Sequence, residues 1–175
     1  MPLHFAPEEF AARLARTRAA MAERQLDGML LFAQESMYWL SGYDSFGYCF
    51  FQCLVLTAGG RMALLTRAPD LRQARHTSNL ADICVWTDSG SAHPADQLRD
   101  LAAELGLKGA TLGIEYETHG LTAANGRAVD AAFAGFATLI DASTLIGGLR
   151  TVKSPAEITF VRRAGELADA ALAAG

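Results

Sequence analysis

The chain has 175 residues, of which 51% are hydrophobic, and its formal net charge at pH 7 is −4. This length suits one globular domain with a sizeable core and a terminal appendage, and it excludes a second full domain. The mildly negative charge argues against nucleic acid as a partner. The longest apolar runs are far shorter than the roughly 20 residues of a membrane-spanning helix, so we also expect no membrane contact.

Patterns typical of helices and strands alternate along the chain. Residues 7–26 carry an apolar stripe at helical spacing, and the continuous apolar run 29–33 is typical of a strand buried on both faces. The elements expected next, in chain order, are helix 35–41, strands 48–57 and 61–66, helix 70–76, strand 83–86, a helix from 94, strand 110–116, helix 121–133 and strand 137–140.

Only the turn Ala58-Gly59-Gly60 separates strands 48–57 and 61–66, so we expect these two to form an antiparallel hairpin. Helices separate most of the other strands. We therefore predict an α/β fold with a mixed β-sheet flanked by helices on both faces, followed by a connector at residues 144–151.

A capping box predicts a strong helix start near the end of the chain. Ser154 and Glu157 stand three residues apart, with Pro155 at the first helical position. The helix that follows has an apolar stripe, which needs a partner to cover it. The stripe consists of Ile158, Val161, Ala168 and Leu172.

The cysteines Cys49, Cys53 and Cys84 are odd in number and lie in predicted strands. A disulfide framework is therefore not expected, and a reducing cytoplasm is the natural location. Two thiols on one strand without nearby histidines fall short of a zinc site. Acidic residues at positions 8 and 9 stand where a signal peptide would carry basic and apolar ones, so we expect no leader.

Three groups of residues are candidates for a site. Glu115, Glu117 and His119 alternate and would offer ligands to a metal if their strand continued, but acids at the solvated end of a strand are the favoured interpretation, and we expect no metal in this chain. Arg75 and His76 belong to a basic patch, with Arg67 and Arg72, that suits a carboxylate, although a solvated helix face is the favoured interpretation.

The third candidate is the aromatic segment at residues 43–51. Tyr48 and Phe50 share one strand parity, and Cys49 and Phe51 share the other. Both sets cannot enter one core, so one set is a candidate for contact with a ligand or partner, while core packing is the default expectation for most of these residues. No nucleophile motif of the G-x-S-x-G type and no P-loop occurs, so we assign no catalytic residue.

Two stretches resemble the creatinase/prolidase family of pita-bread metallohydrolases, in its N-terminal domain. Residues 36–43, SMYWLSGY, look like the family segment N-x-x-Y-L-T-G-Y/F, and an Ile-Glu pair follows a glycine at 114–115. Residues 150–164 match the more specific pattern R-x-x-K-S-P-x-E-I-x-x-x-R-x-A. The resemblance implies a creatinase/prolidase N-terminal fold with a ribonuclease H-like motif over residues 1–150. Residues 151–175 would then be the linker and first helix of a catalytic domain.

The resemblance also implies a function. The parent would be an Xaa-Pro peptidase or creatinase-like hydrolase with two divalent metal ions (Mn, Co or Zn) held beyond Gly175, and this chain alone would be inactive. The expected partners are its own C-terminal catalytic domain, a second copy in a homodimer, and a small peptide or amidic substrate. By approximate alignment Tyr48 and Phe50 would line the substrate pocket, and the absence of the arginine that creatinase has there argues against creatine. The alternative is a catalytically silent binding protein of similar architecture.

Overall fold

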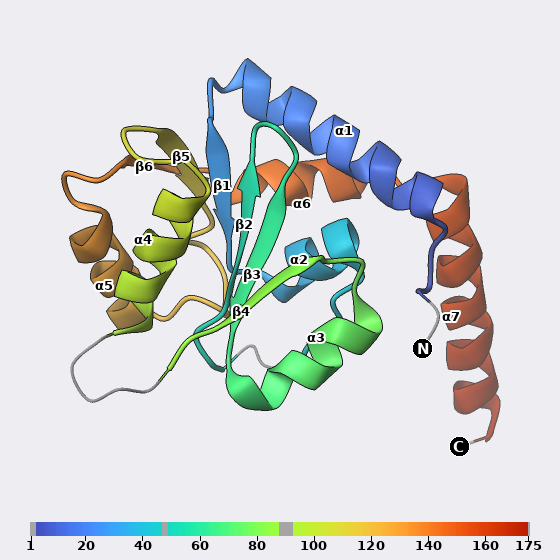
Figure 1. The fold of residues 1–175 in the computed structure, drawn as a ribbon. Coiled ribbons are helices and arrows are strands. Elements are labelled where there is room, and N and C mark those ends of the chain that lie inside the picture. The colour runs from blue at the N-terminus through green and yellow to red at the C-terminus, as the bar shows by residue number, and fades with distance from the viewer. Residues whose placement is uncertain (1–2, 47–48, 88–92, 175) are drawn as a thin grey trace.

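The computed structural model describes residues 3–46, 49–87 and 93–174 (Figure 1). Within them, one mixed sheet has the strand order β4-β3-β2-β1-β5-β6. The strands are β1 (Gly28–Leu31), β2 (Cys53–Thr57), β3 (Met62–Thr66), β4 (Asp82–Val85), β5 (Thr111–Ile114) and β6 (Thr138–Asp141). The helices are α1 (Pro7–Glu23), α2 (Gln34–Ser41), α3 (Leu71–Thr77), α4 (Pro94–Glu104), α5 (Ala123–Phe133), α6 (Thr144–Thr151) and α7 (Pro155–Ala174), with a 3₁₀ turn at Ala68–Asp70.

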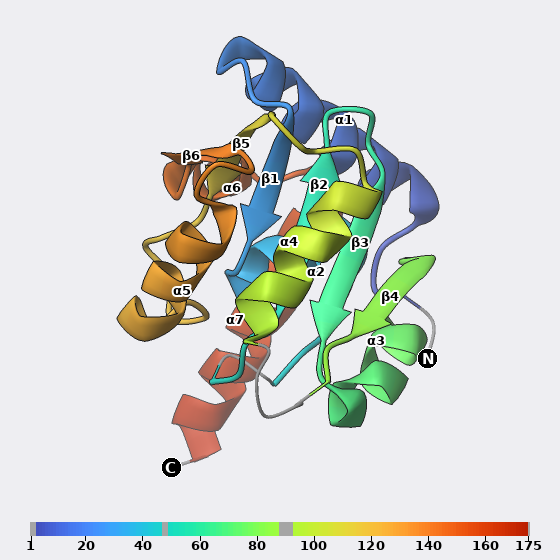
Figure 2. The ribbon, with the colours of Figure 1, turned by 60° about the vertical axis from the view of Figure 1, so that its left-hand side comes forward.

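Helices cover both faces of the sheet, as predicted. α4 and α5 lie on one face, where Leu98 and Phe133 join a core with β1 residue Leu30 (Figure 2). α1, α2, α3 and α6 lie on the other face, around a second core that contains Met21 and Leu40. Alternate residues of the central strands supply the two cores, because successive side chains of a strand point to opposite faces.

Strand pairing confirms the predicted hairpin and the mixed sheet. β2 pairs antiparallel with β1 and β3, whereas β1–β5, β5–β6 and β3–β4 are parallel. Among the described helices, none combines the length and the apolar character that crossing a bilayer requires.

Two expected elements are wrong in detail. Strand 48–57 begins only at Cys53, because the described residues just before it form a turn and an extended segment. The expected connector 144–151 is helix α6, whose Leu145 and Ile146 are buried in the second core. These two adjacent apolar residues both pack against the sheet. Two neighbouring residues do not define a helical period, so the pattern of this short segment did not predict the helix.

The loop after β5 packs against the end of β1 at Gly120. A Cβ atom at this position would lie 2.1 Å from the carbonyl oxygen of Phe32, a backbone atom that cannot swing aside. Gly148, within α6, has nothing within 4 Å of the same point.

We expect Gly120→Ala to lower the free energy of unfolding by roughly 1–3 kcal/mol, because the loop must move off β1. Gly148→Ala is the matched control and should leave stability unchanged or raise it by up to about 1 kcal/mol, since alanine is the better helix former. Urea unfolding of both variants measures the difference. Equal midpoints for the two variants would show that the loop does not press on β1.

A buried arginine joins the start of α7 to the body of the domain. Arg13 of α1 is fully buried; its guanidinium donates to Glu9 (3.0 Å), to the Trp39 carbonyl (2.9 Å) and to Glu157 of α7 (3.1 Å). The Trp39 indole N–H also donates to Glu157, at 2.7 Å. We call Glu9, Arg13, Trp39 and Glu157 the Arg13 cluster; it holds the first turn of α7.

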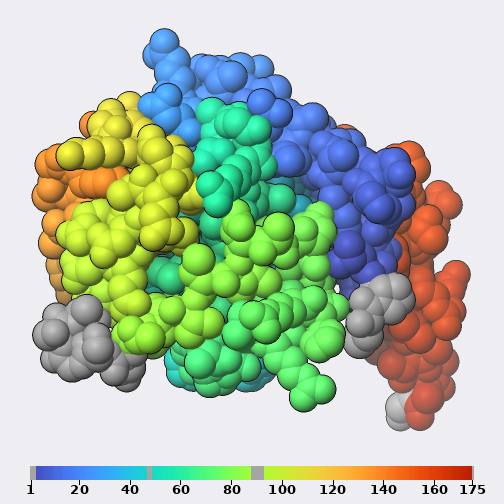
Figure 3. Space-filling model, viewed as in Figure 1, coloured from blue at the N-terminus to red at the C-terminus, as the bar shows by residue number. Residues whose placement is uncertain are grey.

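The predicted capping box is present in the same turn. The other carboxylate oxygen of Glu157 accepts from the Ser154 N–H (2.8 Å), and the Ser154 hydroxyl accepts from the Glu157 N–H (3.1 Å). Beyond this turn the Phe160 ring contacts Phe5, with 5.0 Å between the ring centroids, but no residue of the helix is buried, and Val161 and Leu172 are 53% and 81% exposed. In the space-filling view this helix lies at the edge of the molecule and extends past the body (Figure 3).

The Arg13 cluster should weaken in acid. Burial raises the pKa of Glu157, but the hydrogen bonds from Ser154 and Trp39 and the charges of Arg13 and Arg16 outweigh burial and hold it below its usual value. A lowered folded-state pKa stabilises the fold above the pKa of an unfolded glutamate, about 4.3, and this stabilisation is lost as the pH falls through the lowered value.

We therefore expect Glu157→Gln to destabilise the chain at pH 6, and the difference from the unchanged chain to shrink as the pH falls below about 4. Urea unfolding between pH 3 and pH 7 measures it. Glu166→Gln removes an exposed carboxylate of the same helix that pairs with Arg163 and should shift stability by no more than about 0.5 kcal/mol. A pH-independent difference for Glu157→Gln would contradict the charge argument.

Candidate functional site

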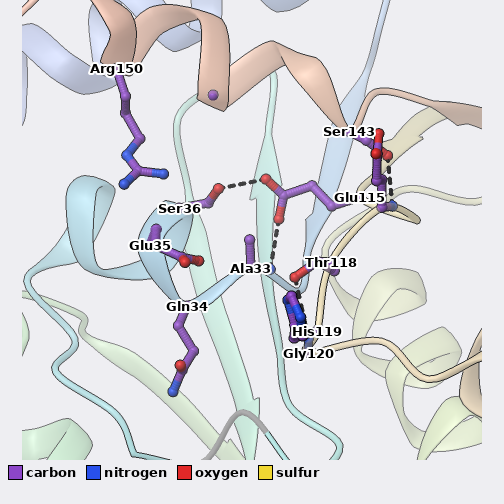
Figure 4. Close-up of a pocket in the computed structure, with 12 residues that line it drawn as sticks. Ala33, Gln34, Glu35, Ser36, Glu115, Thr118, His119, Gly120, Ser143 and Arg150 are labelled. Carbon is purple, nitrogen blue, oxygen red and sulfur yellow. Dashed lines mark hydrogen bonds between the residues drawn. The ribbon is translucent and has the colours of Figure 1, made fainter.

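A polar cavity of about 530 Å³ lies at the carboxyl ends of β1 and β5 (Figure 4). These parallel neighbours send the chain to opposite faces of the sheet: β1 leads into α2 and β5 into α5. In α/β folds, ligands bind outside the strand ends at such a switch point. The lining comes from residues 33–36 at the start of α2, residues 115 and 117–120 after β5, and residues 143, 147 and 150 of the α6 region.

Glu115 forms the floor of this cavity and is only 2% exposed. One carboxylate oxygen accepts from the backbone N–H groups of Phe32 (2.9 Å) and Ala33 (2.8 Å), and the other accepts from the Ser36 hydroxyl (2.5 Å). Burial raises the pKa of Glu115, while these three hydrogen bonds act in the opposite direction. The side chain therefore ties β5 to the end of β1 and to the first turn of α2, which is a structural role.

The loop after Glu115 is held by a serine. The Ser143 hydroxyl accepts from the N–H groups of Tyr116 and Glu117, both at 3.0 Å, and donates to Asp141 at 2.5 Å. The backbone of the cavity rim is thus fixed on both sides, by Glu115 and by Ser143.

Three charged side chains and a histidine line the cavity, and none of the four has a partner among the described residues. Arg150, Glu35, Glu117 and His119 all line it. In the part of the chain that the structure describes, the side chains of these four residues make no hydrogen bond or ion pair; the existing ion pairs involve other residues. Unlike charges that are held apart by a scaffold are available to a ligand that carries both signs.

The residues predicted to line the substrate pocket or to bind a carboxylate do not line this cavity, or they are not among the described residues. Tyr48 lies outside the described residues. Phe50 is 41% exposed, with the Arg67 guanidinium 3.2 Å from its ring centroid, and Arg67 also pairs with Asp70. Arg75 and His76 are exposed in the last turn of α3. None of the described candidates lines the cavity, so their roles stay predictions.

The alternating Glu115, Glu117 and His119 do line one cavity, and the strand ends at Ile114, before all three. The favoured interpretation of solvated acids fits Glu117, which is exposed, but it is wrong for Glu115, which is buried because its carboxylate accepts hydrogen bonds from the end of β1 and from α2. Among the described residues, no three His, Cys, Asp or Glu side chains are placed to hold one metal ion. The cysteines are free thiols: Cys49 is exposed, and burial raises the pKa of Cys53 well above its usual value.

Sequence reasoning missed two arginines. Arg13 stands three residues after Phe10 and four before Thr17, so its place inside the apolar stripe was a signal that it is buried. Arg150 was recognised only as part of a motif that joins two domains, and its position in a cavity depends on the fold of α6.

Removing the Glu115 carboxylate should destabilise the chain. Glu115→Ala leaves the buried N–H groups near Phe32 without an acceptor, and we expect a loss of about 2–5 kcal/mol. Glu115→Gln keeps one oxygen for those N–H groups and should retain most of the stability. Glu117→Ala, an exposed acid of the same loop, is the control and should change stability by less than about 0.5 kcal/mol. Chemical unfolding measures all three; similar losses for the two alanine variants would contradict the structural role.

Comparison with known proteins decides the family. A family model described as the creatinase/prolidase N-terminal domain matches residues 13–152. The chain belongs to this family. The resemblance to this family is thereby confirmed, and so is the fold class; the match includes residues 36–43 and ends at residue 152.

Relatives of this creatinase/prolidase N-terminal domain include longer proteins. The ectoine hydrolase of Halomonas elongata is 29% identical over 174 residues, which cover 94% of this chain and 43% of that protein. An uncharacterized hydrolase/peptidase of Sinorhizobium fredii is 24% identical and is covered to 44%. The chain thus spans less than half the length of the curated relatives it matches.

Solved structures share the fold of the domain. The Xaa-Pro dipeptidase from Bacillus anthracis matches with a TM-score of 0.75 and 24% identity, covering 93% of this chain and 42% of that one. The N-terminal domain of the cytoplasmic peptidase PepQ from Mycobacterium tuberculosis matches with a TM-score of 0.62 and 24% identity, covering 79% of this chain and 98% of that one. At this level of identity the likeness concerns the fold alone.

Proposed function

We propose that this chain is the non-catalytic N-terminal domain of a metal-dependent hydrolase that acts on Xaa-Pro dipeptides or another small amidic substrate. The observation that carries the proposal is the family match over residues 13–152, together with a relative named as a hydrolase of which this chain covers 43%. In this proposal the protein is cytoplasmic and works as a homodimer.

The proposal divides the chain at the end of α6. Residues 1–150 form the N-terminal domain, because α6 still packs into the second core through Leu145 and Ile146. Residues 151–175 form the linker and the first helix of the catalytic domain. α7 supports this division: it is held at its start by the Arg13 cluster and by the contact of Phe160 with Phe5, and no residue of the helix is buried. The catalytic domain would cover its exposed apolar residues.

Two divalent metal ions (Mn, Co or Zn) belong, in this proposal, to the catalytic domain. The acids of the cavity do not fit such a centre, because both oxygens of Glu115 already accept hydrogen bonds from α2 and its approach. Glu35, Glu117 and His119 remain, but among the described residues no three such side chains are grouped so that they could hold one metal ion. The N-terminal domain then contributes binding surface and no metal ligand.

Two observations limit the class of substrate: the exposed ring of Phe50 and the name of one relative. Phe50 offers a half-exposed ring with a guanidinium stacked on it, which suits a small substrate that has a flat or charged group. The relative named ectoine hydrolase adds a second candidate, since ectoine is a small cyclic amidine with a carboxylate. We infer that Tyr48 and Phe50 line the substrate pocket.

The proposal is tested by assaying the longer protein that contains this chain. It should hydrolyse an Xaa-Pro dipeptide or ectoine, with creatine as the disfavoured substrate, and need added Mn²⁺, Co²⁺ or Zn²⁺, while the 175-residue chain alone is inactive. Phe50→Ala in the longer protein should raise KM severalfold with little change in kcat; its unfolding midpoint separates a pocket effect from misfolding. A folded, metal-loaded protein without turnover on these substrates would favour the catalytically silent binding protein.

A further inference from the structure

We propose that the cavity at the carboxyl ends of β1 and β5 binds a small zwitterion, a molecule of amino-acid size with one carboxylate and one cationic nitrogen. All the residues that carry this proposal lie in the 175-residue chain. It therefore does not depend on the hydrolase activity proposed above, and it can fail or hold independently of it.

Arg150 is the group that would take the carboxylate. It is half-buried on α6 and lines this cavity and two adjoining hollows, so its guanidinium stands between them. Figure 4 shows it reaching toward the cavity with no side chain bonded to it. Within the described residues no carboxylate pairs with it. A planar guanidinium binds a carboxylate through two parallel hydrogen bonds, which gives strength and orientation.

Glu35 and Glu117 would take the cationic nitrogen. Both line the same cavity as Arg150, one from the first turn of α2 and one from the loop after β5. The backbone that carries both acids is fixed, because Glu115 holds the first turn of α2 and Ser143 holds the Glu117 backbone, while the two carboxylates themselves are exposed. Arg150 is likewise placed by a helix whose Leu145 and Ile146 are buried. Among the described residues no ion pair joins these acids to the arginine, so a ligand with both charges can pair with them together.

Size and polarity limit the ligand further. The volume of about 530 Å³ falls in the range of small-molecule sites. Gln34, Ser143 and His119 add further hydrogen-bonding groups to the lining. An apolar ligand would leave these groups and the charges unpaired, which costs free energy. A simple anion would bind Arg150 but meet two uncompensated carboxylates.

Isothermal titration calorimetry of the 175-residue chain tests the proposal with named probes. Ectoine, creatine and L-proline are the zwitterions, and acetate and methylammonium carry one charge each. We expect at least one zwitterion to bind with a dissociation constant of about millimolar order, as suits so small a ligand. Acetate and methylammonium should bind about tenfold more weakly or not at all.

Substitutions inside and outside the cavity test whether the zwitterion binds there. Arg150→Gln should weaken zwitterion binding by about tenfold or more, since it removes a charged hydrogen-bond donor. Arg24→Gln makes the same change at an exposed arginine after α1, which does not line the cavity, and should have no effect. Glu35→Gln together with Glu117→Gln should weaken zwitterion binding and strengthen acetate binding, because the repelling carboxylates are gone.

Three results would overturn the proposal. They are the absence of saturable binding by any zwitterion, equal affinity in the Arg150→Gln and unchanged chains, and acetate binding as tightly as the zwitterions. If Arg150→Gln unfolds the chain, the opposite shifts expected for zwitterion and acetate in the two-glutamate variant still decide the question.

Discussion

The buried carboxylate of Glu115 is the interaction on which this structure most depends. It brings the ends of two parallel strands and the first turn of α2 to one point, through two backbone N–H groups and one hydroxyl. A buried carboxylate costs desolvation free energy, and three donors offset that cost only when they are held in place. The polar cavity exists because these elements meet around Glu115 instead of closing on apolar side chains.

The Arg13 cluster joins the body of the domain to α7, as Glu115 joins β1, β5 and α2. Arg13 is buried with two carboxylates and a backbone carbonyl as acceptors, so removing one partner leaves a charge in the interior. Since Glu157 is also the capping residue of α7, the start of that helix and its attachment to the body depend on one side chain. This gives a defined direction to a helix none of whose residues is buried.

Local patterns predicted most elements and the family, but not the site. Helix α2 ends at Gly42 in the left-handed conformation, and His93 caps α4 through its ring nitrogen, both near the predicted ends. Such features depend on neighbours in the chain and are therefore visible in sequence. The cavity joins positions 35, 117 and 150, and no local pattern relates residues so far apart.

By itself the sequence determined the α/β alternation, the hairpin around Gly59-Gly60, the capping box before α7 and the family motif at residues 150–164. Only the tertiary structure decided that Arg13 is buried, that residues 144–151 form a helix, and that Arg150 lines one cavity with Glu35 and Glu117. The physical reason is the range of the forces: propensity and capping act over a few residues, whereas burial and charge placement depend on which distant segments the sheet brings together.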